Sequence, residues 1–163
     1  LPLIKTISGG QTGADRAGLF AARELGLQTG GYISQGYRSL DESGSWPEAK
    51  EFGLEEMNSP LYPPRTAMNV KSSNGTVRFA KDWNSPGELL TLKMIRQYSK
   101  PYFELGMRKY NKNLLQTEYT AFRNWIRAEK IETLNVAGNS EQTAPGIYEF
   151  TYAFLIGALK GYV

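Results

Sequence analysis

Three short segments of the chain combine glycine with small hydroxyl or amide residues, a composition typical of anion-binding turns. They are SGGQTG at residues 8–13, SPGE at 85–88 and GNS at 138–140. Such turns leave backbone N–H groups unpaired, and the N-terminus of a following helix adds a positive dipole. Both features favour a phosphate or carboxylate ligand. None of the three segments contains an obvious nucleophile, so they indicate binding more strongly than covalent catalysis.

Cysteine and histidine, which carry much of protein chemistry, do not occur among the 163 residues. Their absence excludes disulfides, thiol catalysis, Ser-His-Asp triads and metal sites built on these side chains. A metal ion would need oxygen ligands or would arrive already held by an organic cofactor, and we assign no metal-ligating residue. Acid–base chemistry falls to Asp, Glu, Lys or Tyr.

The first turn matches neither of two common phosphate-binding motifs. It lacks the spacing and the lysine of a Walker A motif, and Gln11 stands where a GxGxxG motif has its second glycine. Thr12 or Asp15 is expected to cap the helix that follows. A tight turn without a ligand is the alternative interpretation. Gly18 is expected to allow close packing of this helix on the sheet.

The second and third turns each have a structural alternative. Ser85 and Glu88 have capping-box spacing, so Ser85 would cap the next helix and Glu88 would favour its dipole. Thr91 lies near the start of the same helix. In the functional interpretation, this turn is the opposite wall of a ligand cleft. Segment 138–140 could equally be a polar connection between a strand and a helix.

Two arginines near these turns are candidates for phosphate contact, because a planar guanidinium matches phosphate geometry. Arg16 lies in the first expected helix, and Arg38 follows the second expected strand. Ion pairs are the alternative for both. Arg38 would then pair with Asp41 or Glu42, and Arg16, like Asp15, would pair with a neighbour.

The composition is that of one folded domain, which we expect to span residues 1–163. Hydrophobic residues make up 40% of the chain, and the formal net charge is +3. No apolar run has the length of a membrane helix and no secretion signal precedes the first strand, so we expect a cytoplasmic protein without membrane contact. The mild charge does not favour nucleic acid as a partner, and we interpret the basic segment 108–112 as a solvated loop.

Short apolar runs alternate with amphipathic segments, which is the pattern of an α/β fold. Strands are expected at 3–8, 31–34, 76–80, 101–105 and 133–137. Helices are expected at 14–25, 63–71, 88–98 and 115–130, a last helix is expected to begin at Pro145, and 35–59 is expected to be irregular. Apolar strands of this kind predict a parallel sheet covered by helices on both faces. The three turns would then meet at the carboxyl ends of the strands.

Several motifs, taken in order, resemble a known family. They are SGGQTGADRAGL (8–19), QGYRSLDESG (35–44), SPGELLT (85–91) and LNVAGNSEQTAPGIY (134–148). Together they resemble the molybdenum carrier family, a circularly permuted branch of the SLOG (SMF/DprA-LOG) Rossmann-like superfamily. The resemblance implies a Rossmann-like three-layer α/β/α fold with a central, mainly parallel sheet of about five or more strands. It also implies a homo-oligomer that binds the molybdenum cofactor, a pterin bearing a phosphate.

The resemblance assigns phosphate contact to matching positions in each turn. These are Gly9, Gly10, Thr12 and Gly13 in the first turn, Ser85, Gly87 and Thr91 in the second, and Gly138 with Ser140 in the third. The second turn departs from the family pattern, because Pro86 and Glu88 stand where relatives more often have Gly and Thr. Pro86 removes one N–H donor, and Glu88 adds negative charge where an anion would sit.

We therefore expect a carrier for an anionic, phosphate-bearing cofactor, with the molybdenum cofactor first and a nucleotide or phosphate second. The expected partners are this small ligand, further copies of the chain in a dimer or tetramer, and enzymes that use the molybdenum cofactor. The candidate binding residues are Ser8, Gly9, Gly10, Gln11, Thr12, Gly13, Arg16, Arg38, Ser85, Gly87, Glu88, Thr91, Gly138, Asn139 and Ser140.

Two alternative functions stay open at this point. The chain could be an enzyme that cleaves the N-glycosidic bond of nucleoside monophosphates, as relatives in the wider superfamily do, with Glu88 and either Arg38 or Arg16 as catalytic residues. A carboxylate near the sugar would stabilise the oxocarbenium-like transition state of such a reaction. The chain could also be a sensor that binds a nucleotide-derived signal and passes it to a partner.

Overall fold

The computed structural model describes residues 2–41, 43–109 and 111–163. Glu42, an ion-pair candidate, and Tyr110, part of the basic segment 108–112, lie outside the described residues. The elements are β1 (Lys5–Ile7), α1 (Ala14–Glu24), β2 (Gln28–Ile33), η1 (Gln35–Tyr37), η2 (Pro47–Phe52), β3 (Leu54–Glu56), α2 (Tyr62–Lys71), β4 (Gly75–Ala80), α3 (Pro86–Gln97), β5 (Tyr102–Gly106), α4 (Gln116–Ala128), β6 (Thr133–Gly138) and α5 (Ile147–Leu159). Within these ranges, no helix is both long and apolar enough to cross a membrane.

The strands form one parallel sheet in the order β3-β2-β1-β6-β4-β5. The last strand in the chain, β6, lies between β1 and β4, with Asn135 opposite Ile7 and Val136 opposite Val77. Every residue of β4 is buried. Burial on both faces is what a parallel sheet requires, because helices cover each side of it.

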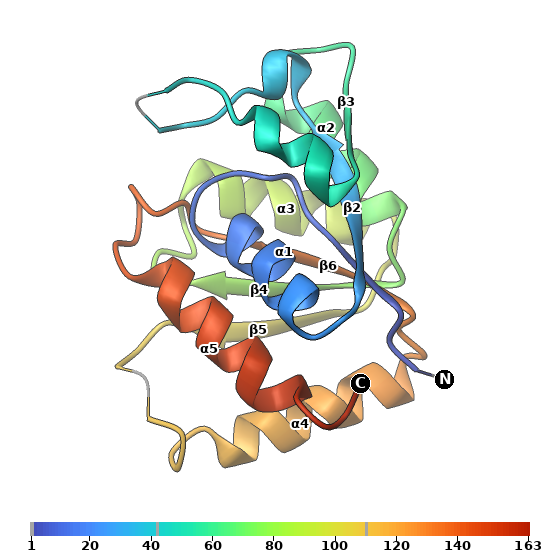
Figure 1. The fold of residues 1–163 in the computed structure, drawn as a ribbon, viewed down its shortest axis with the longest axis vertical. Coiled ribbons are helices and arrows are strands. Elements are labelled where there is room, and N and C mark those ends of the chain that lie inside the picture. The colour runs from blue at the N-terminus through green and yellow to red at the C-terminus, as the bar shows by residue number, and fades with distance from the viewer. Residues whose placement is uncertain (1, 42, 110) are drawn as a thin grey trace.

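Side chains alternate between the two faces of β4, and this alternation defines the layers. Val77 and Phe79 belong to the apolar core that includes α4 and α5, whereas Arg78 reaches α3 and donates to the carbonyl oxygen of Glu88. Helix α5 packs against α1 and α4, and α2 packs against α3. The sheet therefore lies between α1, α4 and α5 on one face and α2 and α3 on the other (Figure 1).

The structure confirms the expected fold class, a Rossmann-like α/β fold with a central parallel sheet. The expectation that 35–59 is irregular is wrong for β3, which adds an edge strand to the sheet. Only Leu54 of its three residues is buried, whereas Glu55 and Glu56 are exposed, so its apolar pattern is too short to recognise. The second strand begins earlier than expected, at Gln28, and the last helix begins at Ile147.

Gly18 lies where α1 crosses the sheet, and the expected close packing at this position is confirmed. A Cβ atom at Gly18 would lie 2.6 Å from the Cβ atom of Val136 on β6. Carbon atoms at that separation would clash, so a glycine is needed for α1 to approach the strand. This packing fixes the height of α1 above the sheet, and so the position of the turn that precedes it.

The core beneath α4 and α5 is built on aromatic rings, and Phe154 is its centre. Its ring centroid lies 5.7 Å from that of Phe79, 5.1 Å from Tyr119 and 5.6 Å from Phe122, and the side chain is fully buried. We expect Phe154→Ala to lower the free energy of unfolding by about 3–5 kcal/mol, through lost burial and a residual cavity. Urea denaturation measures this value.

Leu114→Ala is the matched control for this substitution, because the Leu114 side chain is 69% exposed. It should change the free energy of unfolding by no more than about 0.5 kcal/mol. Equal effects of the two substitutions would show that the aromatic cluster does not dominate the stability of this layer.

Candidate functional site

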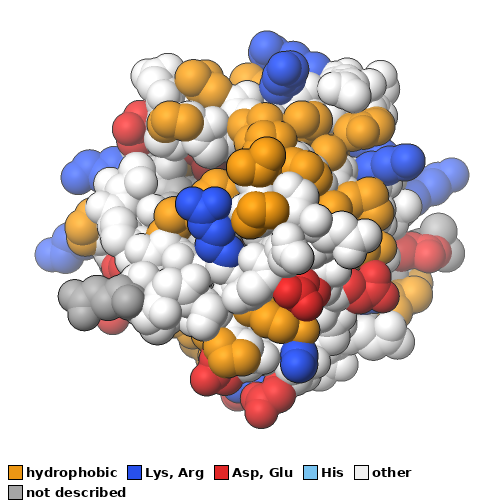
Figure 2. All heavy atoms as spheres, turned by 90° about the horizontal axis from the view of Figure 1, so that it is seen from above, with side chains coloured by type: hydrophobic (Ala, Val, Ile, Leu, Met, Phe, Trp, Pro, Cys, Tyr) orange, Lys and Arg blue, Asp and Glu red, His pale blue; other side chains and the backbone are white. Residues whose placement is uncertain are grey.

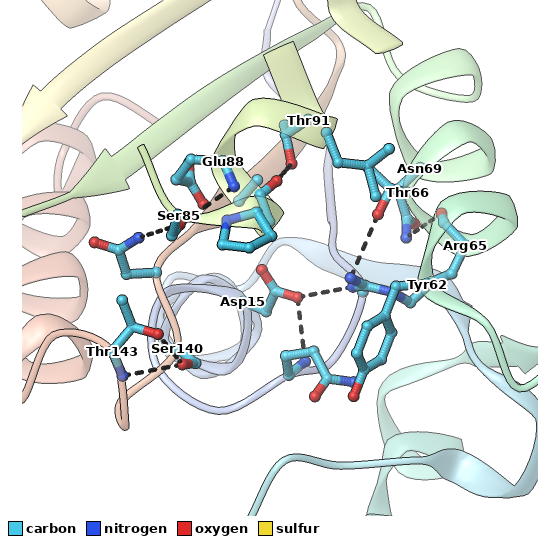
Figure 3. Close-up of a pocket in the computed structure, with 18 of the residues that line it drawn as sticks. Asp15, Tyr62, Arg65, Thr66, Asn69, Ser85, Glu88, Thr91, Ser140 and Thr143 are labelled. Carbon is cyan, nitrogen blue, oxygen red and sulfur yellow. Dashed lines mark hydrogen bonds and ion pairs between the residues drawn. The ribbon is translucent and has the colours of Figure 1, made fainter. Parts of the chain in front are cut away.

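A cavity of about 430 Å³ lies at the carboxyl ends of β1 and β6, on the face of the sheet that carries α2 and α3. Its walls come from the β1–α1 loop, α2, the start of α3, and β6 with the loop after it (Figure 3). β6 and its neighbour β4 are followed by helices on opposite faces, α5 and α3. Ligands of open parallel sheets bind at such a change of direction.

Members of all three predicted turns line this cavity. They are Gly9, Gln11, Ser85, Gly87, Glu88, Thr91, Gly138, Asn139 and Ser140. The other candidates do not line it; these are Ser8, Gly10, Thr12, Gly13, Arg16 and Arg38. The fold thus brings the three turns to one place, and contact of these residues with a ligand stays a prediction.

The two candidate arginines make contacts outside the cavity. Arg16 forms an ion pair with Asp41 at 3.3 Å and lies over the ring of Trp46, so the ion-pair interpretation is confirmed for this residue. Arg38 donates to the carbonyl oxygen of Pro60 at 3.0 Å and lies over the ring of Tyr62. Within the described residues Arg38 has no ion pair, and Asp41 is taken by Arg16 instead.

The glycines of the first turn are each approached closely by another part of the protein. A Cβ atom on Gly9 would lie 1.5 Å from Nη1 of Arg65. A Cβ atom on Gly13 would lie 2.5 Å from the carbonyl oxygen of Asn139. Gly10 and Gly13 also have φ angles of 74° and 83°, which disfavour other residues. The backbone contacts require glycine at Gly13, whereas a side chain at Gly9 would displace the Arg65 guanidinium.

Some of the N–H groups of the first turn are bonded inside the protein. The Gly10 N–H donates to Oγ of Ser8 at 3.3 Å, and the Gln11 N–H donates to Oδ2 of Asp15 at 3.1 Å. At the start of α1, the Ala14 N–H donates to the carbonyl oxygen of Asn139. The expected side-chain cap of α1 is wrong, because no side chain caps this helix. The N–H groups of Gly9, Thr12 and Gly13 have no hydrogen-bond partner among the described residues, and of these three residues only Gly9 lines the cavity.

Asp15 and Arg65 form the charged centre of the cavity wall. Nη1 of Arg65 lies 3.1 Å from Oδ2 of Asp15, and both side chains are largely buried. Burial raises the pKa of the Asp15 carboxyl, while Arg65 and the Gln11 N–H act in the opposite direction. Asp15 forms an ion pair, as the alternative interpretation expected, but its partner is Arg65 of α2, 50 residues away, and not a neighbour in the sequence.

Glu88 is the second carboxyl of the cavity, and its side chain lies against Arg78. Oε1 of Glu88 is 3.5 Å from Nε of Arg78, which also pairs with Glu104. Burial raises the pKa of Glu88 to about 7, Arg78 opposes this shift, and the charges of Asp15 and Glu104 add to it. One half of the expected capping box is present, since the Glu88 N–H donates to Oγ of Ser85 at 3.4 Å.

Asn139 joins the loop after β6 to the loop after β4. Its Oδ1 accepts from the N–H groups of Lys81 and Asp82 at 2.8 and 3.0 Å. Its Nδ2 donates to the carbonyl oxygen of Asp82 and to Oγ of Ser85. Thr12 joins the first turn to the same β6 loop by donating to Oε1 of Gln142 at 2.6 Å. Asn139 and Thr12 therefore position the turns around the cavity.

Several buried polar atoms of the cavity lining have no hydrogen-bond partner among the described residues. They are Oε1 of Gln11, the hydroxyl oxygen of Tyr62, Nε of Arg65 and Oε1 of Glu88. A buried polar atom without a partner is costly, so such atoms indicate a place where a ligand or water supplies the missing bond. The described part of the chain contains no cluster of three or more acidic side chains that could hold a metal ion.

The rim of the cavity is apolar. Leu40 and Pro63 line it, and the neighbouring side chains include Leu61, which is 58% exposed. Seen from above, hydrophobic side chains gather on the face of the molecule that carries α2 (Figure 2). An apolar rim around polar walls suits an organic ligand with a ring system better than a small inorganic anion.

Sequence reasoning missed the part of the site that α2 contributes. Tyr62, Arg65, Thr66 and Asn69 line the cavity from this helix. Steps of three and four residues place them on one face of the helix, and this spacing is visible in the sequence. The polar face of the helix expected at 63–71 was the feature of the sequence that could have indicated these site residues. Which element this face packs against depends on the strand order, and that order was not known.

The strand order and a ligand-sized cavity at its change of direction define a Rossmann-like fold with a binding crevice. The chain belongs to the circularly permutated YpsA SLOG family, whose profile matches residues 6–159. This match confirms the resemblance drawn from the motifs, which named a circularly permuted SLOG branch.

A solved structure from Syntrophus aciditrophicus SB is similar to this chain over almost its whole length. It is a crystal structure named "Putative molybdenum carrier protein", with 33% sequence identity and a TM-score of 0.86. The similarity covers 96% of this chain and 95% of the other. No curated protein matches the chain. The family and this neighbour together support a ligand-binding, carrier-type role.

The raised pKa of Glu88 predicts a pH-dependent stability. An ordinary glutamate titrates at 4.5 and Glu88 in the fold at about 7, so the folded protein binds more protons between these values. The free energy of unfolding therefore falls as the pH rises through 7. Between about pH 5 and about pH 8 this fall should be about 2 kcal/mol greater for the wild type than for Glu88→Gln. Urea denaturation at both pH values measures it, and equal falls would contradict it.

Proposed function

We propose that this protein is a carrier for an anionic, phosphate-bearing organic cofactor, and that the cofactor is the molybdenum cofactor. The observation that carries the proposal is the cavity of about 430 Å³, in which buried polar atoms of Gln11, Tyr62, Arg65 and Glu88 lack partners. Small-molecule sites usually have volumes of about 300–1,000 Å³. The name of the Syntrophus neighbour supports the choice of cargo.

The donor groups at one side of the cavity support a phosphate site. At the start of α3, Pro86 has no N–H group and the Glu88 N–H is bonded to Ser85. The Gly87 N–H is therefore the donor that α3 offers, together with the positive end of its dipole. The hydroxyl groups of Ser140 and Thr143, which are 3.0 Å apart, lie on the β6 loop that lines the same cavity. We assign the phosphate of the cargo to this side.

The metal of the cargo would be held by the cofactor itself. The chain has no cysteine or histidine that could bind molybdenum. The protein would then supply burial, hydrogen bonds and exclusion of water. The same proposal includes a homo-oligomer, a dimer or a tetramer, that gives its cargo to enzymes that use the molybdenum cofactor in the cytoplasm.

Substitution of Gly87 tests the phosphate assignment with little risk to the fold. A Cβ atom at Gly87 would have no neighbour within 4 Å, and its φ angle is not positive. Gly87→Asp places a carboxylate next to the assigned phosphate, whereas Gly87→Asn adds the same volume without charge. We expect Gly87→Asp to bind the molybdenum cofactor at least about tenfold more weakly than Gly87→Asn does, because like charges repel.

Thermal unfolding with a ligand panel measures this difference. The panel contains the molybdenum cofactor, its metal-free pterin, molybdate, AMP and phosphate. A ligand at about 100 times its dissociation constant should stabilise the wild type by about 2.7 kcal/mol. Stabilisation by pterin compounds alone supports the carrier. Equal affinity of the two Gly87 variants would contradict the phosphate assignment, and stabilisation by AMP alone would contradict the choice of cargo.

A second candidate function is hydrolysis of the N-glycosidic bond of a nucleoside monophosphate. The observation that favours it is Glu88, a carboxyl in the cavity with a pKa raised to about 7, which suits a general acid or base. Arg38 would not act with it, since Arg38 does not line the cavity. If the chain is such an enzyme, it releases adenine from AMP.

The enzyme candidate makes a prediction with a matched control. Glu88→Gln should abolish release of free base, whereas Glu104→Gln should not, because Glu104 contacts the same Arg78 but does not line the cavity. Chromatography of the reaction mixture measures free base. If the wild type releases no base from any of a panel of nucleoside monophosphates, the chain is not this enzyme.

A further inference from the structure

One oxygen of the Asp15 carboxyl is held by the protein, and the other is not. Oδ2 accepts from the Gln11 N–H and from Nη1 of Arg65, both at 3.1 Å. No hydrogen bond reaches Oδ1 within the described residues, and Asp15 lines the cavity. Figure 3 shows the second oxygen of Asp15 directed away from the two bonds that hold the first. The carboxyl thus has a fixed orientation and presents one free acceptor.

Two other acceptors of the lining also lack a hydrogen bond. Gln11 is 6% exposed; its Nε2 donates to the carbonyl oxygen of Arg38 at 2.7 Å, which leaves its Oε1 without a partner. Oε1 of Glu88 faces only the 3.5 Å ion pair with Arg78. The charge of Asp15 raises the pKa of Glu88, so the two carboxyl groups interact electrostatically.

These acceptors constrain the chemistry of the ligand. A phosphate group offers acceptors only, and it would be repelled by the Asp15 carboxylate. Arg65 does not remove the conflict, because its charge is already balanced by Asp15. A ligand satisfies the free acceptors only if it brings N–H or O–H donors into the cavity, and N–H donors fixed along the edge of a ring suit acceptors that are themselves fixed. Heterocycles with an amino group beside a ring N–H, as in pterins and guanine, present such donors along one edge.

We propose that Asp15 recognises the amino edge of the ligand's heterocycle. Its free oxygen, Oδ1, would accept a hydrogen bond from an N–H group of a 2-aminopyrimidinone ring. This inference rests on the proposed function, in which the phosphate of the same ligand lies beside Gly87. Asp15 is in this view the residue that determines specificity for the ring, and Gln11 adds a second acceptor beside it.

The bonds that hold Asp15 predict an unusual effect of an amide at this position. In Asp15→Asn, the side-chain oxygen stays with the Gln11 N–H and Arg65, since both are donors. The amide nitrogen must then take the place of the free oxygen and present N–H donors to the cavity. The variant should therefore prefer a ligand with a carbonyl oxygen where the wild type prefers an amino group.

Two ligand pairs test this reversal. Pterin-6-carboxylate and lumazine-6-carboxylate differ at ring position 2, which carries an amino group in the first and an oxygen in the second. GMP and XMP form the same pair among nucleotides and show whether the ring is a pterin or a guanine. Titration calorimetry measures each affinity. The wild type should bind the amino compound of the preferred pair at least about tenfold more tightly, since hydrogen bonds to charged groups are strong.

Asp15→Asn should reverse the preference within the same pair. Asp41→Asn is the matched control, because Asp41 is also paired with an arginine but does not line the cavity, and it should keep the wild-type preference. Equal affinity of wild type for both members of each pair would overturn the proposal, and so would an unchanged preference in Asp15→Asn. If Asp15→Asn does not fold, the wild-type comparison decides alone.

The molybdenum cofactor itself separates this inference from the function on which it rests. If the wild type binds the cofactor but does not distinguish the amino from the oxo compounds, recognition of the ring by Asp15 is contradicted and the proposed carrier function is supported. If the wild type does not bind the cofactor but prefers GMP to XMP, the proposed carrier function is contradicted. Recognition of the ring by Asp15 is then supported, with a guanine nucleotide as the ligand.

Discussion

The ion pair between Asp15 and Arg65 holds the cavity together. It joins the first turn of α1 to the middle of α2, two elements that approach the same strand ends from opposite faces of the sheet. The guanidinium lies so close to Gly9 that a side chain there would occupy its position. Two largely buried charges are tolerated only when they are paired and hydrogen-bonded. The pair fixes the orientation of the Asp15 carboxyl and, together with the bonds from Asn69 to Tyr32 of β2, holds α2 beside the first turn.

The charged side chains of the site form two separate groups. Asp15 forms an ion pair with Arg65. Arg78 forms ion pairs with both Glu88 and Glu104. Burial is the main cause of the raised pKa of Glu88, and the charge of Glu104 beside the same guanidinium adds to it. An anion that enters the cavity would favour the protonated form of Glu88, so binding would take up a proton. The departure of Glu88 from the family pattern is therefore compatible with an anionic ligand.

Much of the fold could be predicted from the sequence, because apolar strands and amphipathic helices have distinct periods. The meeting of the three turns at one edge also followed, since carboxyl ends of parallel strands lie together. The partner of Asp15 did not follow, because Arg65 lies 50 residues away along the chain and only the strand order brings it near. β3 was not predicted for a different reason. Only one of its three side chains is buried, so it shows no alternation of apolar and polar residues.

The position of β6 has a consequence for the order in which the protein is completed. β6 is synthesised after the other five strands of the described sheet, yet it hydrogen-bonds to both β1 and β4 in the middle of that sheet. Before β6 joins the sheet, the other strands form two separate groups, β1–β3 and β4–β5, and no strand connects the two groups by hydrogen bonds. A nascent chain that lacks β6 therefore lacks the complete cavity, and a ligand could bind there only after the residues through Thr143 have left the ribosome.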